Sequence, residues 1–62
     1  MTDFDVLVNS LIIDIELSHK DAHWKANKKH ILSNWLDIYQ RRGDEESRQK
    51  LVAMIKKIQA EL

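Results

Sequence analysis

All three histidines of the chain lie in one dodecamer, HKDAHWKANKKH, which spans residues 19–30. His19 and His23 are four residues apart, so on one helix their imidazoles would lie one turn apart and could bind a single zinc or nickel ion. His30 is seven residues beyond His23, roughly 10 Å along a helix axis, which is too far to share that ion. A complete site would need ligands from another helix or another subunit. The nearest carboxylates in the sequence are Asp14, Glu16 and Asp21.

The same spacing also fits a solvated helix face. If residues 19–42 form one helix, the histidines point nearly opposite Trp24 and Trp35. A bare HxxxH pair is weakly specific, and Lys20 stands where a zincin has its catalytic glutamate. We therefore expect polar surface histidines, with no metal and no cofactor.

Six basic side chains between residues 20 and 42 form a candidate anion-binding set. Lysines neutralise phosphates, and an accessible tryptophan such as Trp24 can stack on a base. These lysines fan around the helix, however, and the chain has ten basic and ten acidic residues, without the basic excess of nucleic-acid-binding domains. Binding of nucleic acid or a phosphate-bearing small ligand is therefore the alternative function. The set is Lys20, Lys25, Lys28, Lys29, Arg41 and Arg42.

Charge is unevenly distributed along the chain. Residues 1–19 contain four acidic and no basic side chains, whereas residues 20–42 contain six basic and two acidic ones. This pattern has two interpretations. Either the two segments neutralise each other, within the fold or across a dimer, or the basic segment faces an anionic partner. We favour neutralisation because the totals cancel.

Catalytic motifs are missing from the sequence. There is no cysteine nucleophile, the serines have no motif around them, and a single glycine excludes a glycine-rich phosphate loop. A helix-turn-helix around Gly43 is disfavoured, because its second helix would open with Asp44, Glu45 and Glu46, which repel phosphates. We expect a non-enzymatic protein.

The absence of proline and the single glycine favour an all-α fold. Apolar spacing predicts three helices. The first covers residues 3–17, the second ends at Arg42 with Gly43 as its C-terminal stop, and the third begins after Asp44 as its N-cap. Residues 28–42 and 44–61 should form an antiparallel hairpin. The first turn stays open between Ser18, which has Asp21 three residues on as in a capping box, and Asn27.

Residues 3–17 carry more apolar side chains than one buried face requires. Thr2 with Asp5 predicts a capping-box start, and a β-strand is the competing interpretation because Val, Ile and Leu are dense here. As a helix, the segment has one broad apolar face and, on the opposite side, a second stripe of Val6, Ile13 and Leu17. The broad face comprises Phe4, Leu7, Val8, Leu11, Ile12 and Ile15.

A helix with two apolar stripes is buried from two sides, and in so small a protein the second side is best covered by another copy. We expect residues 1–62 to form a single small domain of two or three amphipathic helices completed by oligomerisation. No apolar run is long enough to span a membrane, and the first residues lack the pattern of a signal peptide, so we expect a cytoplasmic location.

The function expected from these features is that of a small interaction or regulatory protein that works as a homodimer or higher oligomer, with a further protein as partner. Helix-on-helix burial would provide the contact, and the acidic and basic segments would set its orientation. The expected interface anchors are Phe4, Leu7, Leu11, Ile13, Leu17, Trp24 and Trp35.

Overall fold

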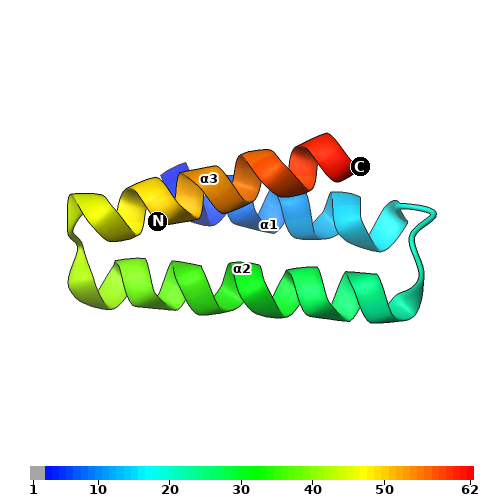
Figure 1. The fold of residues 1–62 in the computed structure, drawn as a ribbon, viewed down its shortest axis with the longest axis horizontal. Helices are drawn as coiled ribbons and strands as arrows, with labels where there is room; N and C mark the ends of the chain where they lie inside the picture. Colours follow the sequence, from blue (N-terminus) through cyan, green and yellow to red (C-terminus); the bar gives the residue numbers. More distant parts are fainter. Residues whose placement is uncertain (1–2) are drawn as a thin grey trace.

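The computed structural model describes residues 3–62 as three helices, α1 (Asp3–Leu17), α2 (Ala22–Arg42) and α3 (Glu45–Glu61). Successive helices run in opposite directions, so α1 and α3 are antiparallel to α2, which lies along one side of both (Figure 1). The predicted all-α fold is confirmed, and no strand occurs in these residues. The competing β-strand interpretation of residues 3–17 is wrong, and the predicted cap at Thr2 lies outside the described residues.

The connection between α1 and α2 falls at Ser18, one of the two predicted positions. The Ser18 hydroxyl donates a hydrogen bond to the Ile15 carbonyl at 2.6 Å, and so closes α1. Asp21 is the N-cap of α2, and its carboxylate accepts the Trp24 backbone N–H at 2.7 Å. Asn27 therefore lies within α2 and ends no helix.

The corner between α2 and α3 has the predicted cap residues. Gly43 adopts the left-handed conformation, φ 64°, and its N–H donates to the Tyr39 carbonyl at 2.7 Å. Asp44 is the N-cap of α3 and accepts the Ser47 backbone N–H at 3.1 Å. Hydrogen bonding from Ser47, with a smaller effect from the nearby Arg42 guanidinium, lowers the pKa of Asp44 below its ordinary value. These local signals produce the predicted antiparallel hairpin.

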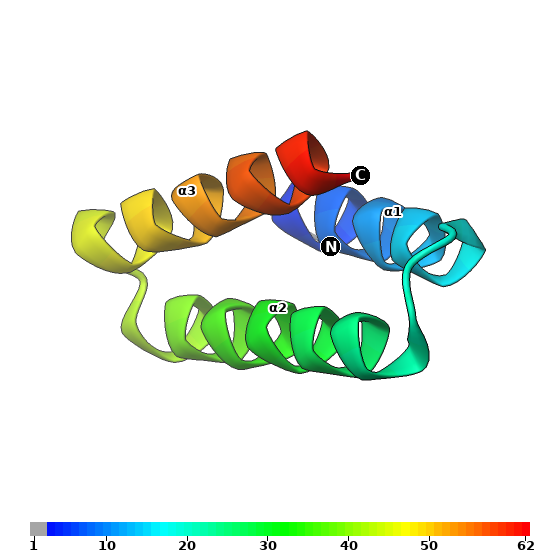
Figure 2. The same cartoon turned by 45° about the vertical axis from the view of Figure 1, so that its right-hand side comes forward.

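A small apolar core lies where the three helices meet. α1 and α3 each contribute three of its fully buried side chains and α2 contributes one, while Phe4 closes one end by packing edge-on against Tyr39 at 5.3 Å between ring centroids. α2 packs against both other helices, whereas α1 and α3 touch over a shorter stretch and diverge (Figure 2). The core residues are Val8, Leu11, Ile15, Leu32, Leu51, Ile55 and Ile58.

The molecule is elongated, measuring 34 × 19 × 17 Å. Within residues 3–62, none of the helices combines the length and the hydrophobicity needed to cross a membrane.

Candidate interaction surfaces

The outward side of α1 is apolar. Val6, Ile13 and Leu17, here called the α1 outer stripe, are 60%, 57% and 77% exposed. At 100° per residue they point away from the core residues of the same helix, and the described part of the chain leaves more than half of each side chain exposed. Exposed apolar side chains at helical spacing are typical of a contact surface.

Two acidic residues of α1, Asp5 and Glu16, have partners on α2. Lys29 of α2 forms an ion pair with Glu16 at 3.0 Å, and Lys25 donates to the Glu16 carbonyl at 2.9 Å. Gln40 donates to the Asp5 carboxylate at 2.9 Å. Part of the charge complementarity predicted between the first two segments is thus satisfied within one chain.

The predicted interface anchors divide into exposed and internal residues. Leu7, Ile13 and Leu17 are exposed as expected. Leu11 is a correction: it is 2% exposed and belongs to the core of its own chain, so it cannot anchor a contact with a partner. Phe4 is half-buried, with Tyr39 on one side of the ring and the Arg48 guanidinium 5.8 Å from its centroid.

Val6 is absent from the predicted anchors although its exposure exceeds that of Leu7. Its helical spacing with Ile13 and Leu17 already placed Val6 on the same side of the helix as two predicted anchors.

Trp24 and Trp35 are half-buried on the side of α2 that faces α3. A groove of about 270 Å³, here called the α2–α3 groove, is lined by Trp35, Lys50, Ala53, Met54 and Lys57. Its apolar side chains come from both helices, and the Lys50 ammonium lies 5.6 Å from the Trp35 ring centroid.

Trp24 lies eleven residues before Trp35 on α2 and is also flanked by cations. The Lys20 and Lys28 ammonium groups are 5.4 Å and 5.8 Å from its ring centroid. This side of the molecule therefore combines aromatic surface with positive charge.

The six predicted anion-binding residues do not form one patch. Five of them have an acidic or carbonyl partner in their own chain, and Lys20 lies over Trp24. Sequence reasoning missed Lys50 and Lys57, which are exposed beside the groove and take part in none of the ion pairs found in residues 3–62. The internal partners are Glu16 for Lys25 and Lys29, Glu61 for Lys28, Asp37 for Arg41 and Asp44 for Arg42.

The histidines are exposed, as expected for a solvated face. His19 lies in the turn after α1, whereas His23 and His30 are on α2, so the one-turn spacing of a helical pair does not apply to His19 and His23. Over the described part of the chain, no three His, Asp or Glu side chains come together as a metal site.

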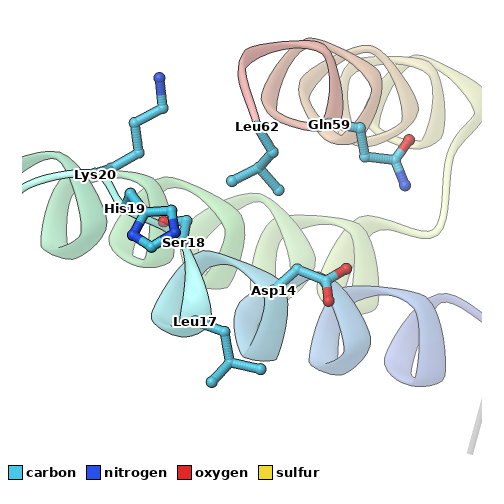
Figure 3. A pocket seen from close by; sticks show the side chains of 7 residues that line it. All are labelled: Asp14, Leu17, Ser18, His19, Lys20, Gln59 and Leu62. Atoms are coloured by element: carbon cyan, nitrogen blue, oxygen red, sulfur yellow. The ribbon is translucent and has the colours of Figure 1, made fainter.

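A second depression, of about 660 Å³, lies where the last turns of α1 and α3 meet. Its lining mixes apolar and polar groups, and Figure 3 shows His19 and Asp14 on different sides of it, with the Leu62 side chain between α1 and α3. The geometry contains no acid–base pair positioned on a common point. The lining residues are Asp14, Leu17, Ser18, His19, Lys20, Gln59 and Leu62.

Comparison of this chain with models of protein families, with curated proteins and with solved structures found no match.

Proposed function

We propose that this protein is a non-enzymatic interaction protein that works as a helical homo-oligomer. The observation that supports the proposal is the α1 outer stripe, whose three large apolar side chains are each more than half exposed. Fully burying one such side chain contributes about 1.5–3 kcal/mol. Association therefore offers this small molecule apolar burial that its own core does not provide.

In the proposed mechanism, α1 uses its two apolar sides for different purposes. Val8, Leu11 and Ile15 hold α1 to its own chain, and the outer stripe packs on another molecule. A second copy and a helix of a different protein would compete for the same stripe, and this competition provides a physical basis for a regulatory role. The proposed location is the cytoplasm, since a cysteine-free chain needs no oxidising compartment.

Sedimentation equilibrium tests the proposal. The wild-type chain should show a mass that rises with concentration through the tens of micromolar, and the variant Ile13→Asn/Leu17→Asn should remain a monomer with unchanged helicity. The matched control Ala26→Asn/His30→Asn changes two exposed residues with the same spacing on the polar side of α2, and should associate like the wild type. A folded wild-type monomer over the whole range would refute the proposal.

The second candidate function is binding of nucleic acid or a phosphate-bearing ligand. What favours it is the placement of Lys20, Lys28 and Lys50 within cation–π distance of the two tryptophans. Against it stand the internal partners of five of the six predicted cations. Fluorescence anisotropy with a labelled single-stranded oligonucleotide separates the two functions: this candidate requires tight binding that weakens steeply with salt, and no binding at low salt ends it.

A further inference from the structure

We propose that the α1 outer stripe of one copy docks into the α2–α3 groove of the next copy, so that the protein associates head to tail rather than by a two-fold contact. This inference rests on the proposed function and names the partner surface of the stripe. It follows from the shape of the two surfaces, from their charge and from their positions in the bundle.

The two surfaces match in chemistry. The stripe extends from Val6 to Leu17, about 16 Å of helix, and the groove lies beside Trp35 of α2 and residues 50–57 of α3. The groove presents the Trp35 ring, Met54 and the small, exposed Ala53, which leaves room for another helix to approach between α2 and α3. An amphipathic helix seated in an apolar groove is a recurrent mode of protein recognition.

The charges of the two surfaces are complementary. α1 has no Lys or Arg, and Asp14 is exposed beside Ile13. Lys50 and Lys57 line the groove, and neither takes part in an ion pair within residues 3–62. A two-fold contact between two α1 helices would bring acidic helices together with no cation from either, whereas head-to-tail docking places lysines beside the acid.

The stripe and the groove lie on opposite sides of the molecule. Three helices surround one core, so the outward side of α1 faces away from the seam between α2 and α3 (Figures 1 and 2). Docking one copy on the next then leaves a free stripe at one end and a free groove at the other. Such a contact continues into a chain of copies or closes as a ring.

Complementation of two variants tests this inference by sedimentation equilibrium. The stripe variant Ile13→Asn/Leu17→Asn keeps an intact groove, and the groove variant Ala53→Glu/Lys57→Gln keeps an intact stripe. Each should be a folded monomer alone, and an equimolar mixture should form a one-to-one pair that grows no further, because it contains one functional stripe and one functional groove. The control Ala26→Glu/His30→Glu makes the same change of charge at the same spacing on α2 and should associate like the wild type.

Two results would overturn the inference while leaving the proposed function intact: a groove variant that associates like the wild type, or a mixture that stays monomeric while the wild type associates. A wild-type chain that is monomeric throughout would remove the proposed function itself. Circular dichroism of each variant establishes that it is folded before its mass is interpreted.

Discussion

At the residue scale, the Asp44 carboxylate couples the stability of the α2–α3 corner to pH. Hydrogen bonding from Ser47 and the neighbouring Arg42 lower the pKa of Asp44 in the folded chain below its ordinary value of 3.8. A carboxyl group with a depressed folded pKa stabilises the fold above its unfolded pKa, and this contribution declines as pH falls below 3.8 toward the folded value.

Asp44→Asn should remove this pH dependence while retaining an N-cap, because Asn caps helices about as well as Asp. Chemical denaturation between neutral pH and the acid range would measure it. The difference in stability between wild type and variant should shrink as pH falls below 3.8. A difference that stays constant with pH would show that the Asp44 charge has no role in the cap.

Two isoleucines of α1 allow the core and the outer stripe to be compared with one substitution. Ile15 is fully buried and Ile13 is 57% exposed. Ile15→Val should lower the free energy of unfolding by about 0.5–1.5 kcal/mol, whereas Ile13→Val should change it by only a few tenths. Denaturation at high dilution, where association is minimal, measures both. Equal effects would mean that Ile13 is covered within its own chain.

At the element scale, the hairpin depends on one backbone conformation at Gly43. A Cβ added there meets no atom within 4 Å, so the cost of a side chain comes from the left-handed φ of 64° and not from a clash. Gly43→Ala should therefore destabilise the fold by about 1–2 kcal/mol, and Gly43→Asn by less, because Asn tolerates this conformation. Thermal and denaturant unfolding would check the order; an alanine variant as stable as the wild type would contradict it.

The helices were predictable because their signals are local. Gly43 and Asp44 lie side by side in the sequence, and the two stripes of α1 follow from the spacing within one helix. Spacing alone, however, does not show which stripe faces the chain's own core, and this is why Leu11 was predicted as an anchor although it is buried.

At the scale of the whole molecule, the α2–α3 groove depends on contacts between residues far apart in the sequence. Trp35 meets Lys50 and Lys28 meets Glu61 only once the register of the hairpin is fixed. The sequence shows which residues of segment 20–42 are charged, but it does not show that most of the basic ones already have partners in their own chain. The candidate site was therefore predictable on α1 and not between α2 and α3.

Self-association through the outer side of α1 is the central claim, and a dilution series of amide and indole NMR spectra tests it most directly. From high to low concentration, the amide signals of Val6, Ile13 and Leu17 should shift together, and those of His30 and Asn34 on the exposed side of α2 should stay fixed. Head-to-tail docking predicts that the Trp35 indole and Ala53 signals move with the stripe. Spectra of the folded chain that do not change with concentration would contradict the claim.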